Sequence, residues 1–172
     1  MTRAGYRASQ FIHALFANPA ADDAGLAAAH LPPALRPLFD SMRRAEQAHS
    51  LAVLRALKRQ GCTDPDLMAA ALLHDVGKTR APLRLFDRVL VVLSHSLLSA
   101  AARTWSAGAP SGWRRPWVVA AQHAGWGGEM VADAGGSARL EAIIRRHHET
   151  PLSRTTELDD LLAALQAADG SH

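Results

Sequence analysis

A histidine and an aspartate stand side by side in this sequence where an apolar helix would end. His74 and Asp75 directly follow the apolar run Ala69–Leu73. A carboxylate carried into an apolar interior is costly unless it is paired or binds a cation. Imidazole nitrogens and carboxylate oxygens are together the donors that divalent first-row metals prefer. The pair is therefore a candidate for metal ligation at the end of a buried helix.

Four further residues of the same kinds stand on, or just beyond, apolar stripes of other predicted helices. They are His49, His123, His147 and Asp169. Apolar residues at three- and four-residue spacing lead to each of them, which puts each side chain on an inward face. A lone histidine of this kind is more often a core residue, but six such groups together favour a shared metal centre. With so many donors, two metals bridged by one carboxylate fit the set.

One of these assignments has a rival. His95 shares a stripe with Val91, Val92 and Leu98, so it competes with His123 as an inward-facing histidine. Both alternatives stay open at the level of the sequence, although the sequence around His123 favours that residue.

Helices must position these groups. The chain has 172 residues, 48% of them hydrophobic, and a single cysteine, Cys62. This length suits one domain with a core that needs no disulfide framework. Alanine and leucine supply about a third of the residues and β-branched residues are few, which favours helix over sheet. No segment alternates with period two, so we expect an all-α domain without strands.

Capping and breaking residues divide the chain into helical segments. Asp64-Pro65 is a start signal, Gly61 an end signal, and Thr156 with Asp159 resembles a capping box. The predicted helices are Tyr6–Ala17, Asp22–His30, Ser41–Gln60, Asp64 to about Gly77, Pro82–Trp105, a helix that begins at Pro116, Ser137–His147 and Thr156–Asp169. The helix that begins at Pro116 is expected to fray at Gly125, Gly127 and Gly128.

The order of these motifs resembles the HD superfamily of metal-dependent phosphohydrolases. The segment His74-Asp75-Val76-Gly77-Lys78 is similar to its HDIG/HDxGK signature. The segments 123–130 and 146–149 resemble the H-P-E-x-G-A and HHE segments of its two-metal branch. That branch includes cyclic-dinucleotide phosphodiesterases of the HD-GYP type and HD-type diadenosine tetraphosphate hydrolases. Thr150-Pro151-Leu152 follows the HHE segment, so the GYP motif is absent.

The resemblance implies an HD-domain helical bundle that holds two divalent ions, of Fe, Mn, Co, Ni or Mg. One ion would take His49, His74, Asp75 and Asp169. The second would take His123, His147 and the bridging Asp75. The implied catalytic residues are Asp75, Lys78 and His148, and the implied phosphate contacts are Lys78, His148, Arg114 and Arg115.

The resemblance also predicts the organisation of the chain and its reaction. Residues 1–40 would form an N-terminal helical extension packed on an HD domain of residues 41–172, with a helix and loop inserted after the HD motif. The Trp105–Trp117 part of that insertion would cover the site. The expected activity is hydrolysis of a nucleotide or other phosphoester by a metal-activated water. The alternatives are a non-catalytic regulatory or nucleotide-binding HD module and a two-iron HD oxygenase.

Charge and hydropathy limit the partners. The net charge is +3 and the pI is about 9.7, carried mostly by arginine, and this does not predict stable nucleic-acid binding. The first ten residues lack the apolar region of a signal peptide. The longest apolar run, residues 89–102, is short and interrupted by polar residues, so no membrane span is expected. The expected location is the cytoplasm, and the oligomeric state is left open.

Overall fold

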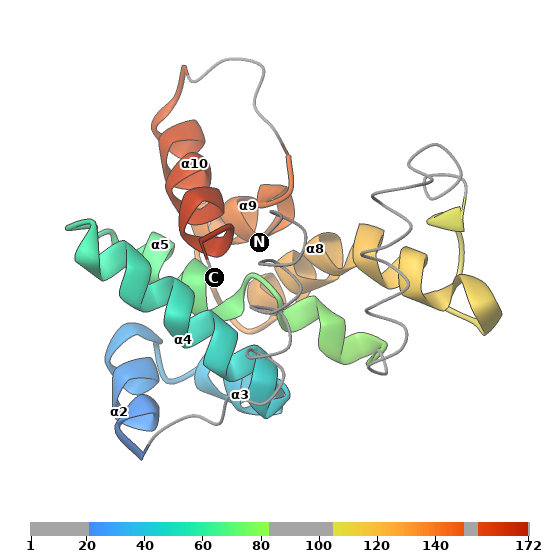
Figure 1. Cartoon of the computed structure of the whole chain (residues 1–172), viewed down its shortest axis with the longest axis horizontal. Coiled ribbons are helices and arrows are strands. Elements are labelled where there is room, and N and C mark those ends of the chain that lie inside the picture. Colours follow the sequence, from blue (N-terminus) through green and yellow to red (C-terminus); the bar gives the residue numbers. More distant parts are fainter. Residues whose placement is uncertain (1–20, 83–104, 150–154, 172) are drawn as a thin grey trace, which may run out of the picture.

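The structure is a computed structural model that describes residues 21–82, 105–149 and 155–171. Its elements are α2 (Ala21–His30), α3 (Arg36–Ser41), α4 (Arg44–Arg59), α5 (Pro65–Leu73), the 3-10 helices η1 (Val76–Arg80) and η2 (Gly112–Arg114), α8 (Arg115–Asp133), α9 (Ala138–Arg146) and α10 (Glu157–Asp169). The described residues contain no strand, so the predicted all-α helical bundle is confirmed (Figure 1).

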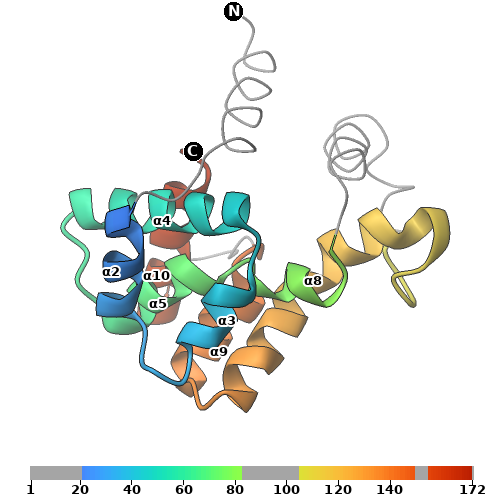
Figure 2. The same ribbon diagram turned by 90° about the horizontal axis from the view of Figure 1, so that it is seen from below.

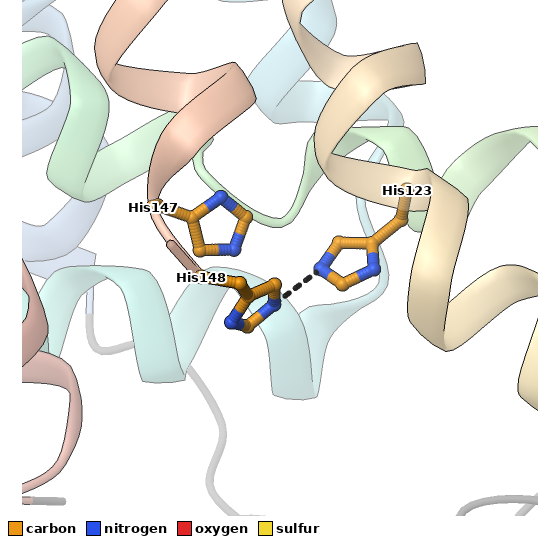
Figure 3. Close-up of side chains that lie close together, drawn as sticks. All are labelled: His123, His147 and His148. Carbon is orange, nitrogen blue, oxygen red and sulfur yellow. Dashed lines mark hydrogen bonds between the residues drawn. The ribbon is translucent and has the colours of Figure 1, made fainter. Parts of the chain in front are cut away.

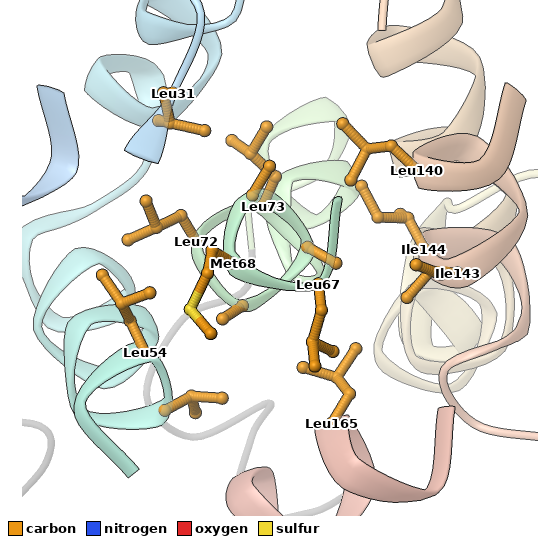
Figure 4. Packing of buried hydrophobic residues seen from close by; sticks show 14 of the residues in the cluster. Leu31, Leu54, Leu67, Met68, Leu72, Leu73, Leu140, Ile143, Ile144 and Leu165 are labelled. Carbon is orange, nitrogen blue, oxygen red and sulfur yellow. The ribbon is translucent and has the colours of Figure 1, made fainter. Parts of the chain in front are cut away.

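Helix α5 forms the centre of the bundle (Figure 4). Every residue from Leu67 to Leu73 is buried. Leu54 of α4, Ile143 of α9 and Leu165 of α10 belong to the buried cluster around it. A helix that is apolar on all sides belongs in the interior of a domain. The residues that directly follow α5 are therefore carried into the interior as well.

Capping contacts confirm the predicted starts of three helices. The Asp64 carboxylate accepts a hydrogen bond from the Leu67 amide at 2.9 Å, at the start of α5. Ser137 accepts one from the Leu140 amide at 3.0 Å, at the start of α9. Thr156 begins α10 with a reciprocal capping box. Each contact satisfies an amide that has no partner within its own helix.

The single helix expected over residues 41–60 is wrong at its start. Met42 and Arg43 are extended, with ψ of 152° and 149°, so a separate α3 ends at Ser41 and α4 begins at Arg44. The Glu46 carboxylate accepts a hydrogen bond from the Arg43 amide at 3.2 Å and so caps α4. Helix α3 was not predicted, because six residues that include a proline show no helical periodicity.

Helix α8 runs unbroken through the glycines where we expected it to fray. The reason is the contact between α8 and η1. A Cβ atom on Gly77 would lie 1.9 Å from the His123 carbonyl oxygen, and one on Gly127 would lie 3.3 Å from the Gly77 nitrogen. Glycine at these positions allows two backbones to approach closely and does not end the helix. This contact sets the turn after Asp75 against His123.

The outer end of α8 projects from the bundle (Figures 1 and 2). A tryptophan cluster gathers there, from η2, the start of α8 and residue 105. Trp105, Trp113 and Trp117 make edge-to-face contacts with ring centroids between 5.1 and 5.9 Å apart. Trp113 is 65% exposed. The helix expected over residues 82–105 falls almost entirely on residues 83–104, outside the described residues. A covering role for the 105–117 segment stays a prediction.

Helices α2 and α3 pack on the same core as the later helices. Ala27 of α2 and Phe39 of α3, with Leu31 and Leu35 between them, belong to the buried cluster that contains Leu72. The helix expected over residues 6–17 lies outside the described residues, and the division at residue 40 stays a prediction. Among the helices that the structure describes, none combines the length and the apolar character needed to cross a bilayer.

Gly77→Ala is expected to lower the free energy of unfolding by about 3 kcal/mol, since overpacking against backbone cannot relax by a side-chain movement. The added methyl group would overlap the His123 carbonyl and the Gly127 nitrogen. Gly125→Ala in α8 is the control, because nothing lies within 4 Å of its Cβ position. That alanine should stabilise the protein by about 0.5–1 kcal/mol. Urea denaturation measures both, and equal stability of the two variants would contradict this account of Gly77.

Candidate metal centre

Three helix ends meet at one place, and each carries a predicted ligand. His74 is the C-cap of α5, His147 is the C-cap of α9, and Asp169 is the last residue of α10. Carbonyl groups without partners give the C-terminal end of a helix a partial negative charge. Three such ends close together favour a bound cation.

Backbone carbonyls orient three of the imidazole rings. The Nδ1 atoms of His74, His123 and His147 lie 3.1, 3.0 and 2.7 Å from the carbonyl oxygens of Ala71, Val119 and Ile144. Since a carbonyl only accepts, Nδ1 carries the proton and Nε2 keeps its lone pair. A ring held in this way is prepared to bind a metal through Nε2.

The side chains form two clusters, in each of which the potential ligand atoms lie within 4.8 Å of one another. The first cluster contains His49, His74 and Asp169, and the second contains His123, His147 and His148. In the first, His49 Nε2 lies 2.8 Å from Asp169 Oδ1 and His74 Nε2 lies 3.7 Å from the same oxygen. In the second, the Nε2 atoms of His123 and His148 are 3.1 Å apart (Figure 3).

Asp75 joins the two clusters. Its Oδ2 lies 3.8 Å from His74 Nε2 and its Oδ1 lies 3.4 Å from His123 Nε2. The carboxylate is buried, and the Lys78 ammonium lies 2.6 Å from Oδ2. One buried carboxylate thus faces both clusters and a cationic side chain.

Electrostatics keeps both carboxylates ionised. Burial raises the pKa of Asp75, but the positive charge of Lys78, the neighbouring His74 imidazole and the contacts with His123 outweigh burial and hold this pKa well below its usual range. Burial also raises the pKa of Asp169, but the hydrogen bond from His49 and the nearby imidazoles lower it to about 2. Metal binding needs deprotonated ligands, and these two carboxylates are in that state.

Burial keeps two histidines of the second cluster neutral. Together with the neighbouring imidazoles, it lowers the pKa of His147 to about 2 and that of His148 to about 4. His49 in the first cluster differs, because its contacts with Asp169 and Asp75 outweigh burial and raise its pKa. His147 and His148 therefore present uncharged nitrogen donors, the form of histidine that ligates a metal.

The His147 Nε2 atom shows whether a metal fits this arrangement. It is buried and has no hydrogen-bond partner among the described residues. Leaving a buried polar atom unsatisfied costs about 1–3 kcal/mol. The His147 ring lies between those of His74 and His123, at centroid distances of 5.4 and 5.3 Å. An unpartnered nitrogen among imidazoles and carboxylates fits a metal centre.

Comparison with known proteins bears on the same residues. A family model described as HD domain matches residues 47–172. The chain belongs to the HD-domain family. HD domains form a superfamily of metal-dependent phosphohydrolases, and the matched range includes both clusters and Asp75. No curated protein and no solved structure gives a significant match.

This HD domain brings together the six residues predicted as metal ligands. They are His49, His74, Asp75, His123, His147 and Asp169. It also places His148, which the resemblance assigned to phosphate contact, among the potential ligands of the second cluster. The rival residue His95 lies outside the described residues.

Arg114 and Arg115 lie at the far end of α8 from the two clusters. Arg114 donates hydrogen bonds to the carbonyls of Trp105 and Ala107, and Arg115 donates one to that of Pro82. Arg115 precedes His123 by eight residues, or about 12 Å along the helix axis. These contacts hold the outer segment on α8, and the phosphate role of both arginines stays a prediction.

The metal-free HD domain is expected to lose stability as the pH falls below about 6.5. The folded state keeps His147 neutral down to about pH 2, whereas the unfolded chain takes up a proton near pH 6.5. The unfolded state therefore binds more protons in this window, and the free energy of unfolding falls by up to about 1.4 kcal/mol per pH unit for this residue. Urea denaturation in chelator between pH 7.5 and 4.5 measures the slope. His147→Leu should reduce that slope, and an unchanged slope would show that His147 does not cause it.

Proposed function

We propose that this HD domain hydrolyses a phosphoester of a nucleotide or another phosphorylated small molecule and holds two divalent metal ions. The observation that carries the proposal is the buried Asp75 carboxylate, which faces His74 of the first cluster and His123 of the second. The unpartnered His147 Nε2 supports the same arrangement.

Each cluster would bind one ion, with Asp75 shared between them. The first cluster offers two imidazoles and a carboxylate, and the second offers three imidazoles. Because imidazole suits first-row transition metals and magnesium prefers oxygen ligands, the second cluster favours Fe, Mn, Co or Ni over Mg. When bound, such ions lower the pKa of a coordinated water and polarise a phosphoryl oxygen.

The protein side chains would supply the remaining parts of the reaction. Asp75 and Asp169 stay ionised and balance the charge of the cations. The side chain of Lys78 is 30% exposed beside Asp75, where its ammonium can reach a substrate phosphate. His148 lies at the exposed edge of the second cluster, where burial of its ring and the neighbouring His123 lower its pKa to about 4. Its 3.1 Å distance from His123 favours a ligand role over the implied phosphate contact.

The direct test is a substrate panel of mononucleotides, dinucleoside polyphosphates and cyclic dinucleotides with Mn, Fe, Co, Ni and Mg. We expect phosphate release from at least one class with a transition metal, and loss of activity in chelator. A folded protein that binds no metal and hydrolyses nothing would support the non-catalytic HD module. Oxygen consumption that depends on iron would support the oxygenase.

Lys78→Ala is expected to raise KM for phosphoesters while both ions stay bound. The loss in kcat/KM should correspond to about 1–3 kcal/mol, as for one charge-assisted hydrogen bond. Lys58 is the other lysine of the chain and is exposed on α4, so Lys58→Ala is the matched control and should leave kcat/KM unchanged. Steady-state kinetics with metal analysis measures both. Loss of metal in Lys78→Ala would give Lys78 a structural role instead.

A further inference from the structure

One face of α10 reaches both clusters. Asp159, Gln166 and Asp169 are seven and three residues apart, which places them on the same side of a helix. Asp169 contacts His49 in the first cluster at 2.8 Å. Asp159 accepts a hydrogen bond at 3.4 Å from Arg146, the last residue of α9 before the second cluster. Helix α10 thus contacts a residue of the first cluster and the helix end that leads to the second cluster.

Gln166 holds the backbone of the turn that carries the second cluster. Its Nε2 donates to the His147 carbonyl at 3.0 Å and to the Glu149 carbonyl at 2.6 Å. Carbonyls at the end of a helix have no partner within that helix. The two carbonyls lie on either side of His148 in the chain. One side-chain amide therefore fixes the turn in which the His147 and His148 rings lie 3.9 Å apart.

The position of Gln166 is itself set by the core. Leu162 and Leu165 are fully buried, which fixes the rotation of α10 about its axis. Gln166 is adjacent to Leu165 and is directed at the end of α9. The residues of the first cluster come from α4, the end of α5 and α10, and none of their contacts above involves Gln166.

We propose that Gln166 is a positioning residue for the second ion, an inference that rests on the proposed two-ion function. Its amide holds the His147–Glu149 backbone so that both imidazoles meet His123. Groups that orient metal ligands without touching the metal typically change metal affinity by about 10- to 100-fold. Loss of the Gln166 amide therefore lowers the affinity for the second ion and leaves the affinity for the first ion unchanged.

The test compares Gln166→Met with Gln47→Met in the full chain. Gln47 is a matched control on α4, because its Nε2 also donates to two backbone carbonyls, those of Phe39 and Asp40 at 2.9 and 3.5 Å. Metal-free protein is titrated with Co²⁺, followed by absorption and by metal content per chain. In Gln166→Met we expect the first ion to bind as in the wild type and the second about tenfold more weakly or worse. Gln47→Met should bind both ions as the wild type does.

Several outcomes separate the inference from the function on which it rests. A wild-type protein that binds a single ion would overturn the two-ion function and the role of Gln166 with it. If the wild type binds two ions and Gln166→Met binds the second ion with the same affinity, only the role of Gln166 is overturned. The same holds if Gln47→Met weakens binding of the second ion as much as Gln166→Met does. Gln166→Lys keeps a side-chain hydrogen-bond donor at this position. Its ratio of second-ion to first-ion affinity should therefore return toward the wild-type ratio. The inference would be overturned if Gln166→Lys showed a ratio of second-ion to first-ion affinity as low as that of Gln166→Met. If Gln166→Met does not fold, a ratio in Gln166→Lys below that of the wild type would overturn it.

Discussion

Asp75→Ala is expected to abolish phosphoester hydrolysis and to strip the protein of metal while the helices stay folded. Asp75 is the carboxylate that faces both clusters, so its loss removes a ligand from each proposed ion. The fold should survive, because alanine also removes a buried charge, and Lys78 is exposed enough to be hydrated once its partner is gone. Metal content, phosphate release and circular dichroism of one preparation measure the three effects.

Asp66→Ala is the control for this variant. Asp66 lies at the start of α5 and accepts hydrogen bonds from Arg139 and Ser137, at 2.8 Å each, away from both clusters. Its loss should lower the stability by about 1 kcal/mol and leave metal and activity in place. Full activity of Asp75→Ala would overturn the assignment of the metal centre.

His123→Ala is expected to reduce bound metal from two ions per chain to one, with the protein still folded. Removing one ligand lowers the affinity for the ion that it binds far more than the affinity for the neighbouring ion. His123 belongs to the second cluster, so the second ion should be lost. Activity should fall by about a thousandfold or more, since stabilisation of phosphoryl charge by a cation is worth several kcal/mol. Metal content per chain and kcat measure both effects.

Two other histidines serve as controls for His123. His30 contacts Lys58 at the end of α2 and belongs to neither cluster, so His30→Ala should keep two ions. His95→Ala tests the rival assignment, and loss of the second ion in that variant would replace His123 by His95. A second metal site would be contradicted if the wild type saturated with one ion per chain and His123→Ala bound the same amount.

Local signals predicted most of the helices but not the contact between η1 and α8. The helices that begin at Pro65, Ala138 and Glu157 carry their start signals in the residue before them. Gly127 also carries a local signal, that of a helix breaker, and this signal misled. Its actual role depends on Gly77, fifty residues earlier, whose backbone packs against it. Such a pairing cannot be seen in either segment alone.

The candidate site was predictable to the extent that its side chains lie on helix faces. Apolar stripes led to His49, His123 and Asp169, and these residues do meet their predicted partners. His148 follows a different rule, because α9 ends at Arg146 and the next two residues form a turn. Neighbours on a helix point in different directions, whereas this turn lets two adjacent rings face the same centre. The amide of Gln166 that holds the turn is likewise a tertiary contact without a local signal.

The meeting of three helix C-termini at the metal centre has a consequence for the life of the protein in a cell. The negative ends of α5, α9 and α10, with two carboxylates beside them, favour a cation bound between them, so the folded state should gain stability from its metal. A ligand that binds only the folded state adds stability in proportion to the logarithm of its concentration. Cellular proteases remove chains that unfold more often. The amount of this protein should therefore follow the supply of its divalent metal even at a constant rate of synthesis.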